Sequence, residues 1–308
     1  MLNLCYRFLI KGHIMIYYYK HKSITDLLPQ ELDLLGYDGV SQYAKEHNMS
    51  EIELFGQLKN LESEIQAMGS RPFDMSTGSN RALFNKWTNK YIDFFNKNAK
   101  YEKQAYIILG NIASGKSTFA KSIEEPTASI ILDPDRYKMG EMTENGYFEG
   151  FTSLYKQPTD RERLQDPCSD AIKQTLVDVS NEGMNIIMPK ATTSLTKLEK
   201  QLQVLTDKNY DIHLILFESP IEDCANRNYF RYLIKEYSKE PENGVQSHGR
   251  FVPVSVITNI GDGTFTTFAK AHRSGRFKSY KAFFNKGTFG SNTASYTNEE
   301  IDLETMEF

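Results

Sequence analysis

A glycine-rich stretch, GNIASGKST at residues 110–118, has the residue types and spacing of a phosphate-binding loop. It matches the pattern GxxxxGK[ST] in full through Gly110, Gly115, Lys116 and Ser117. In such a loop the backbone N–H groups surround an anion, the lysine reaches the β- and γ-phosphates, and the hydroxyl holds Mg²⁺. The stretch therefore predicts that ATP or a similar nucleoside triphosphate binds here, with Ser117 as a ligand of Mg²⁺. The alternative is a loop that matches by chance.

One residue of this loop departs from the common pattern, because Ala113 stands where glycine is frequent. The nucleotide-binding residues that we expect are Gly110, Asn111, Ile112, Ala113, Ser114, Gly115, Lys116, Ser117 and Thr118. Phosphate binding alone does not separate a kinase from a GTPase or a mechanical ATPase. The residues that follow must therefore indicate what receives the phosphate.

Two carboxylates follow the next apolar run, in the sequence ILDPDRYK. Asp133 and Asp135 stand two residues apart and share one face if the strand continues. At the carboxyl end of a strand beside the loop strand they would face the nucleotide, one placing Mg²⁺ and the other accepting a hydroxyl proton. The alternative is a strand-end turn built on Asp-Pro. The pair favours phosphoryl transfer to an alcohol.

Three of the arginines that come later in the chain could contact the phosphates. Arg227 and Arg231 are one helical turn apart and would project together from a helix, and Arg250 follows in the sequence HGRFVP. Arginines from a mobile lid commonly meet the charge that develops between the phosphates. Taken alone, however, the spacing of these arginines is more typical of solvated surface residues than of catalytic ones.

Five features, in order along the chain, resemble the zeta toxin family, P-loop kinases related to bacterial toxin–antitoxin systems. They are the loop GNIASGKS, the strand end ILDPDRYK, the stretch NIIMPKATT, the helix after Ser219-Pro220 that carries Arg231-Tyr232, and GRFVP at 249–253. The resemblance covers roughly residues 101–285. The loop is shared by many families, whereas the ordered set is much more specific.

The resemblance implies a role for individual residues. Lys116 would bind phosphate, Asp135 would be the general base, and Arg231 and Arg250 would stabilise the transferred charge. On the substrate side it implies contacts from Asp133, Arg136 and Thr192. Family members phosphorylate a sugar hydroxyl of UDP-N-acetylglucosamine or related nucleotide sugars. The expected function is thus an ATP-dependent kinase of a small metabolite.

One segment departs from the family. After the third apolar run many members carry an acidic residue and then Gly-Thr, but this chain has Met188-Pro189-Lys190-Ala191-Thr192-Thr193, which lacks the carboxylate. Two other readings therefore stay open. One is a kinase that acts on a polynucleotide or a protein, and the other is a nucleotide-binding effector with little catalysis.

The elements that must position these residues are short apolar runs that alternate with helical segments. The runs lie at 105–109, 129–132, 184–188 and 212–217, and the long helical segments between them include 161–180 and 195–207. This order predicts an α/β fold, with a P-loop kinase-like parallel sheet covered by helices on both faces. Looser alternation at 277–284 predicts a late edge strand, with an antiparallel direction left open.

The chain divides into three parts on this reading. Residues 1–100 form a helical N-terminal region, 101–286 the kinase domain, and 287–308 a polar, acidic tail that is expected to be disordered. The apolar N-terminal stretch is interrupted by charged residues, so no run approaches the ~20 residues of a membrane span.

Composition limits the partners and the compartment. The 308 residues are 40% hydrophobic and carry a net charge of −4, which argues against general nucleic-acid binding. The cysteines Cys5, Cys168 and Cys224 are too widely spaced for a disulfide framework or a metal site, so a reducing, cytoplasmic location is expected. A secretion signal in the acidic tail is the alternative. The expected partners are a small-molecule substrate and no membrane, with an antitoxin or regulatory partner left open.

Overall fold

The chain is described from a computed structural model. The described residues are 5–10, 13–18, 44–45, 48–50, 53–54, 56–57, 60, 71–72, 76–79, 81–82, 85, 99–134, 162–163, 165–221, 223–225, 227–228, 252, 254–288, 295–300 and 303.

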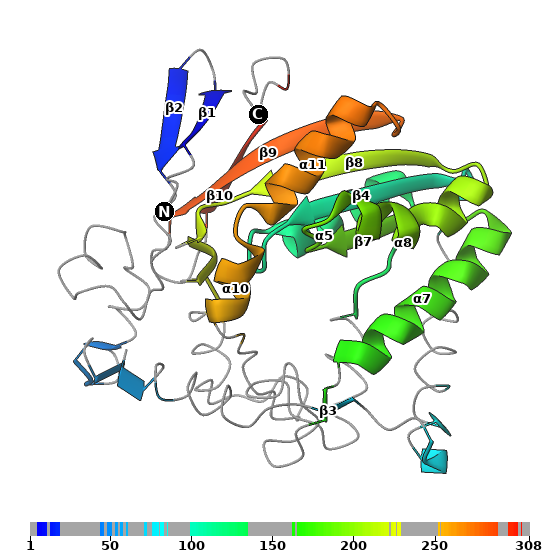
Figure 1. Ribbon diagram of the computed structural model, residues 1–308, viewed down its shortest axis with the longest axis horizontal. Coiled ribbons are helices and arrows are strands. Elements are labelled where there is room, and N and C mark those ends of the chain that lie inside the picture. Colours follow the sequence, from blue (N-terminus) through cyan, green and yellow to red (C-terminus); the bar gives the residue numbers. More distant parts are fainter. Residues whose placement is uncertain are drawn as a thin grey trace.

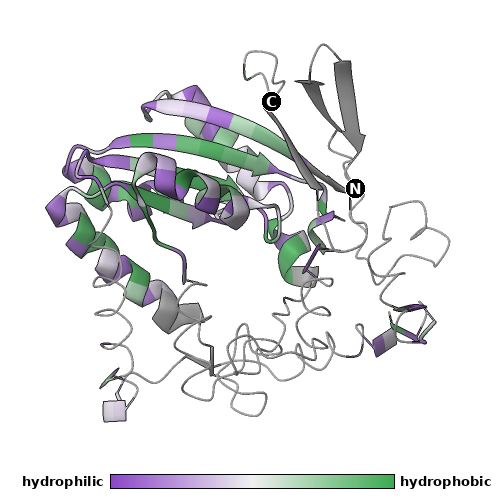
Figure 2. Cartoon of the chain, turned by 180° about the vertical axis from the view of Figure 1, so that it is seen from behind, coloured by the Kyte–Doolittle hydropathy of each residue, from purple (hydrophilic) through white to green (hydrophobic). Residues whose placement is uncertain are grey.

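A six-stranded sheet with the order β10-β9-β8-β4-β7-β5 forms the centre of the molecule (Figure 1). Its strands are β4 (Gln104–Gly110), β5 (Ile130–Ile131), β7 (Ile186–Lys190), β8 (Asp211–Glu218), β9 (Ser279–Thr288) and β10 (Ser295–Glu300). The strands from β9 to β5 pair in parallel, and β10 pairs with β9 in the antiparallel direction. The hydrophobic residues gather in the central strands (Figure 2), as a sheet buried on both faces requires.

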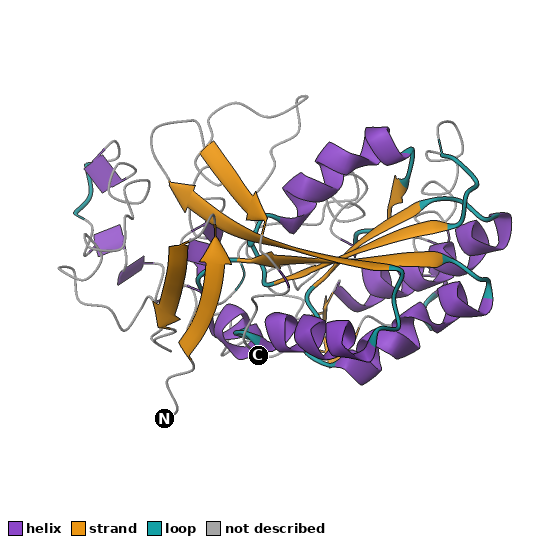
Figure 3. Cartoon of the chain, turned by 90° about the horizontal axis from the view of Figure 1, so that it is seen from above, coloured by secondary structure: helices purple, strands orange, loops and turns teal. Residues whose placement is uncertain are grey.

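Helices lie on both sides of this sheet (Figure 3). They are α5 (Lys116–Thr127), α7 (Gln165–Glu182), α8 (Leu195–Asp207), α10 (Val254–Ile260) and α11 (Gly263–Ser274). On one face Ile107 and Leu109 share a core with residues of α7, α8 and α11, such as Phe268. On the other face Ile108 packs with Ala120 of α5. The predicted α/β class and the two covered faces are confirmed.

The described helices do not include one that could cross a membrane, since none is both long and apolar enough.

Two smaller sheets lie outside the central one. The strands β1 (Cys5–Ile10) and β2 (His13–Tyr18) form an antiparallel hairpin, and β3 (Arg71–Pro72) pairs in parallel with β6 (Glu162–Arg163). The prediction that residues 1–100 are helical missed this hairpin. The sequence does carry a signal for it: two runs of mostly β-forming residues flank Lys11-Gly12, and two-residue hairpin loops favour glycine. Most of the predicted helical region lies outside the described residues.

The carboxyl-terminal part of the sheet differs from the expectation in two ways. The strand β9 runs parallel to β8 and is not at the edge, because β10 pairs with its other side. The strand β10 falls within residues 287–308, which the sequence reading treats as a disordered tail. Its sequence, SYTNEE, is polar, so its pairing rests on backbone hydrogen bonds that no hydrophobic pattern reveals.

Candidate nucleotide and phosphate site

The glycine loop joins the buried strand β4 to the first turn of α5, as the motif predicts. Gly115 stands at the start of the helix with φ of 102°, a conformation that glycine adopts at little cost. Ala113 also has a positive φ, 59°, which explains why glycine is common at this position. The amino end of α5 and the backbone N–H groups of its first turn therefore face the carboxyl edge of the sheet, where an anion is favoured.

Two predicted side chains at this helix end make contacts within the site. The ammonium group of Lys116 donates a hydrogen bond of 2.5 Å to the backbone oxygen of Asn111. The hydroxyl of Ser117 donates one of 3.4 Å to Oδ2 of Asp133, which is buried. The structure thus brings the loop lysine, the loop serine and the first of the two aspartates together.

The route by which Asp133 reaches the loop differs from the expectation. The strand beside β4 on this side is β7, so the strand that precedes Asp133, β5, lies one place further from the loop. Helix α5 packs against β4, β7 and β5, so it crosses β7 on its way. Ser117 lies in the first turn of this helix, 3.4 Å from the carboxylate of Asp133, although β4 and β5 are not adjacent.

The oxygen pair of Ser117 and Asp133 suits a magnesium ion. Hydroxyl and carboxylate oxygens are the ligands that Mg²⁺ prefers, and the ion usually takes only one or two protein ligands beside phosphate and water. Among the residues that the structure describes, no group of three or more His, Cys, Asp and Glu could hold a metal ion by itself. The two oxygens of Ser117 and Asp133 match the one or two protein ligands that Mg²⁺ takes when it binds together with a nucleotide.

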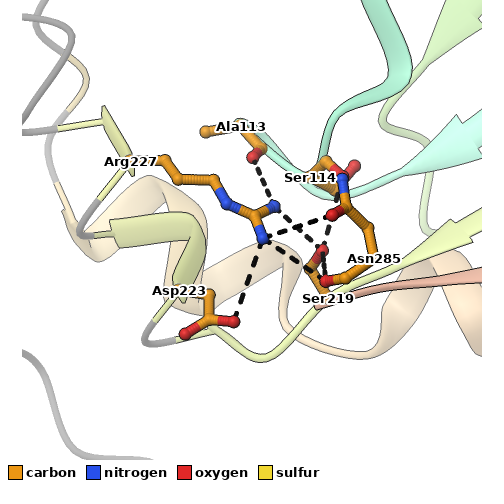
Figure 4. A network of polar contacts seen from close by, with 6 residues as sticks. All are labelled: Ala113, Ser114, Ser219, Asp223, Arg227 and Asn285. Atoms are coloured by element: carbon orange, nitrogen blue, oxygen red, sulfur yellow. Dashed lines mark hydrogen bonds and ion pairs between the residues drawn. The ribbon is translucent and has the colours of Figure 1, made fainter. Parts of the chain in front are cut away.

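A buried polar network supports the loop from behind (Figure 4). The backbone oxygen of Ser114 accepts hydrogen bonds from Nδ2 of Asn285 (2.9 Å) and from the hydroxyl of Ser219 (3.3 Å). The guanidinium of Arg227 lies among these residues and contacts the loop at Ala113. The loop is thus tied to the end of β8 and to β9. Sequence reasoning missed Ser219 and Asn285, and it placed Arg227 beside Arg231 as a surface or lid residue.

A second support of the loop comes from Asn111. Its side-chain Nδ2 donates to the backbone oxygens of Ile257 (3.0 Å) and Gly261 (3.2 Å), at the carboxyl end of α10. Its Oδ1 accepts a hydrogen bond of 2.7 Å from the backbone N–H of Ile112. Asn111 therefore joins the loop to α10, the helix that directly follows the GRFVP stretch.

The two arginine-bearing elements named by the resemblance also meet. Residues 221–228 are helical where they are described, and Nδ2 of Asn228 donates a hydrogen bond of 2.7 Å to the backbone oxygen of Val252. Asn228, in the helix after Ser219, therefore contacts Val252, the described residue of the stretch at 249–253. This contact brings together segments that are far apart in the sequence.

The other predicted site residues divide into two groups. Thr192 follows β7, and its hydroxyl contacts the backbone oxygen of Ser194 at 3.5 Å. Asp135, Arg136, Arg231 and Arg250 lie outside the described residues. Their roles stay predictions, whereas all nine loop residues, Asp133 and Thr192 have described positions.

Lys190 stands at the carboxyl end of β7, opposite Leu109 of the loop strand, and is partly buried. Burial lowers the pKa of Lys190 from 10.5 to about 8; Asp133 acts in the opposite direction, and Lys173 adds to the lowering. This amine occupies the segment where family members carry a carboxylate. Lys190 therefore places a positive charge near Asp133, at the edge of the sheet next to the loop.

We expect that Lys190→Met stabilises the protein at pH 7, and that the gain shrinks between pH 8 and 10.5. Below pH 8 the amine is charged in both states, so its burial costs free energy in the folded state. Between the folded pKa of about 8 and the unfolded value of 10.5, the unfolded chain binds more protons, so wild-type stability rises with pH. Urea unfolding of both proteins at several pH values measures this, with the exposed Lys197→Met as the control. A stability difference independent of pH would contradict it.

Cys224 is fully buried beside the loop-supporting network. Burial raises the pKa of its thiol to about 12, although Arg227 and Lys116 act to lower it. We therefore expect the folded protein, with Cys5 and Cys168 replaced by serine, to resist a thiol reagent at pH 8 and to react fully in denaturant. Absorbance of the released chromophore measures this. Rapid labelling of the folded protein would show that the thiol is accessible.

Comparison with known proteins identifies the family of this chain. The sequence profile of the Zeta toxin family matches residues 90–299. Among curated proteins, no relative matches the chain. The chain is similar to a solved structure from the PezAT chromosomal toxin–antitoxin system of Streptococcus pneumoniae, at 15% identity and a TM-score of 0.47, covering 66% of this chain and 78% of that one.

Two structures of AvrRxo1-ORF1 with AvrRxo1-ORF2 are also similar. The native complex has 13% identity and a TM-score of 0.48, with 72% of this chain and 67% of that chain covered. The complex with ATP has 11% identity and a TM-score of 0.40, with 91% and 74% covered. At such identities and TM-scores these likenesses support no conclusion on substrate or partner.

Proposed function

The chain belongs to the zeta toxin family of ATP-dependent kinases, and from this premise we propose that it transfers the γ-phosphate of ATP to a hydroxyl group of a small metabolite. A nucleotide sugar resembling UDP-N-acetylglucosamine is the acceptor class that we propose. The observation that carries the proposal is the contact between Ser117 and Asp133, 3.4 Å apart at the end of the phosphate-binding loop. It joins a carboxylate to a phosphate site, as phosphoryl transfer requires.

The proposed reaction uses residues of this chain at both ends of the transferred group. The loop amides and Lys116 bind the β- and γ-phosphates, and Ser117 with Asp133 would hold Mg²⁺, which neutralises phosphate charge when bound. Asp135 takes the proton of the acceptor hydroxyl while the oxygen of that hydroxyl forms a bond to the γ-phosphorus. The bond between the γ-phosphorus and the β–γ bridging oxygen breaks, and ADP leaves. Arg231 and Arg250 stabilise the charge on the transferred phosphoryl group.

The acceptor side is proposed to involve Arg136 and Thr192. Asp133 fits better as the metal-side carboxylate, since its oxygen lies beside the hydroxyl of Ser117. The segment from Pro189 to Thr193 lacks the acidic residue found in many family members, and Lys190 adds a positive charge nearby. This difference supports an acceptor that carries negative charge, such as the diphosphate of a nucleotide sugar.

The test is to incubate the purified protein with ATP, Mg²⁺ and a panel of nucleotide sugars, dinucleotides and nucleosides, and to read the products by mass. Asp135→Asn is the matched control, because it keeps the size of the side chain and removes the base. A gain of one phosphate by one compound, with the wild type alone, supports the proposal and names the acceptor.

ATP binding without a phosphorylated product for either protein would overturn the small-molecule proposal. That outcome would favour a kinase that acts on a polynucleotide or a protein, or a nucleotide-binding effector with little catalysis. A regulatory protein partner is part of the proposal as well, because the family is related to toxin–antitoxin systems. A product that forms at the same rate with and without a co-expressed candidate partner would count against that partner.

A further inference from the structure

A buried guanidinium lies directly behind the phosphate-binding loop (Figure 4). Arg227 is 3% exposed, and its Nη1 donates hydrogen bonds to the backbone oxygen of Ala113 (3.3 Å) and the hydroxyl of Ser219 (3.1 Å). Its Nη2 donates to the backbone oxygen of Asn285 (3.3 Å) and lies 3.9 Å from the carboxylate of Asp223. One side chain thus joins the loop, the end of β8 and the strand β9.

The loop can bind phosphate only if its amides face the anion, and its carbonyls must then face inward. A buried carbonyl without a hydrogen bond destabilises the folded protein, so this conformation needs donors behind it. Asn285 and Ser219 supply donors for the carbonyl of Ser114, and Arg227 supplies one for the carbonyl of Ala113. Ala113 also has a φ of 59°, which is unfavourable for a residue with a side chain.

We propose that Arg227 is a positioning residue, which holds the loop in its phosphate-binding conformation before the nucleotide arrives. The inference rests on the proposed function, because it concerns the same ATP site. Arg227 does not touch the nucleotide in this account; it acts through the carbonyl of Ala113 and through Ser219. A loop that is already arranged binds ATP without the cost of ordering it.

The shape of the side chain matters as well as its charge. The planar guanidinium has five N–H donors and reaches the loop, Ser219 and Asn285 at once, whereas a lysine ammonium is a compact point charge. Lysine at this position should therefore restore the charge but only part of the hydrogen bonding. This predicts a graded series in which arginine binds ATP best, lysine less well and glutamine least.

The experiment measures the dissociation constant of ATP by calorimetry, with no acceptor present, for the wild type, Arg227→Lys and Arg227→Gln. We expect an increase of about 10²-fold for glutamine and about tenfold for lysine, since a misplaced loop loses hydrogen bonds to the charged phosphates, each worth about tenfold or more in affinity. Arg276→Ala is the arginine control, because Arg276 pairs with Glu199 and does not contact the loop. Its ATP affinity should equal that of the wild type.

A second measurement separates positioning from general destabilisation. Phe268→Leu lowers the stability of the core without touching the loop. If its melting temperature is as low as that of the Arg227 variants, its ATP affinity should still equal that of the wild type. With an acceptor, the Arg227 variants should raise the KM for ATP while kcat at saturating ATP changes less than about threefold, because ATP binding restores the loop.

Folded Arg227→Gln with an ATP affinity within twofold of the wild type would overturn the inference. If Arg227→Gln does not fold, Arg227→Lys decides in the same way. The binding assay needs no acceptor. The effect of the Arg227 variants on ATP affinity can therefore be interpreted even if the proposed kinase reaction does not occur. Normal ATP binding by the wild type and weakened binding by the variants would support positioning even if no metabolite is phosphorylated.

Discussion

Replacing Lys116 by alanine is expected to lower kcat/KM for phosphoryl transfer by about 10²-fold or more, by analogy with the loss of other charge-stabilising contacts. Lys116 lies at the first position of α5, and its ammonium group bonds to the loop carbonyl of Asn111. In the reaction this cation stabilises charge that grows between the phosphates. Steady-state kinetics with the acceptor that the mass assay identifies, or ATP turnover, measures the loss.

The matched control is Lys121→Ala, which removes an exposed lysine from the same helix. Both variants should keep the melting temperature of the wild type within a few degrees, because neither side chain supports the core. An unchanged kcat/KM in a folded Lys116→Ala protein would remove the lysine from the mechanism. Equal losses in both variants would point instead to a general effect of charge on the helix.

Replacing Gly115 by alanine is expected to weaken ATP binding by about 10²-fold, because a displaced loop loses one or two hydrogen bonds to the charged phosphates, each worth about 1.5–3 kcal/mol. Gly115 has φ of 102°, where a side chain is strained, and an added Cβ would collide with Nδ2 of Asn285. That amide supports the loop by donating to the carbonyl of Ser114. The methyl group must therefore displace either the loop or its support. Calorimetric titration with ATP measures the effect.

Gly275→Ala provides the control for strain without collision. Gly275 ends α11 with φ of 61°, and an added Cβ would meet nothing within 4 Å. This variant should lose about 1 kcal/mol of stability and keep its affinity for ATP. If both alanine variants bind ATP as the wild type does, the loop is not held as tightly as the contacts of Asn285 indicate.

The support of the loop by residues from distant segments bears on the whole site. Asn111 reaches the end of α10, Arg227 reaches β9, and Asn228 reaches Val252 two residues after Arg250. Hydrogen bonds therefore join the loop to α10 and to β9, and they join the helix after Ser219 to Val252. Buried hydrogen bonds of this kind help to hold a site in one conformation. A change in any of these residues is expected to affect more than its direct neighbour.

Local patterns were enough to predict several features of this protein. The helix at 195–207 has the predicted bounds, and the strand β4, the loop and α5 follow one another as the motif requires. These features depend on residues close together in the chain: apolar runs for buried strands, and glycines with a lysine for the loop. The α/β class follows from the alternation of such runs with helices.

Tertiary structure alone decided the order of the strands, the direction of β9 and the presence of β10. The strand β7 separates β5 from the loop strand, and the polar strand β10 pairs through its backbone. It also decided that Arg227 is buried under the loop, where helical spacing had suggested a residue projecting with Arg231. The reason is physical: a hydrogen bond between Asn285 and Ser114 joins residues 171 positions apart. No local pattern contains both partners of such a contact, so the sequence by itself determined the chemistry of the loop and the fold determined what holds it in place.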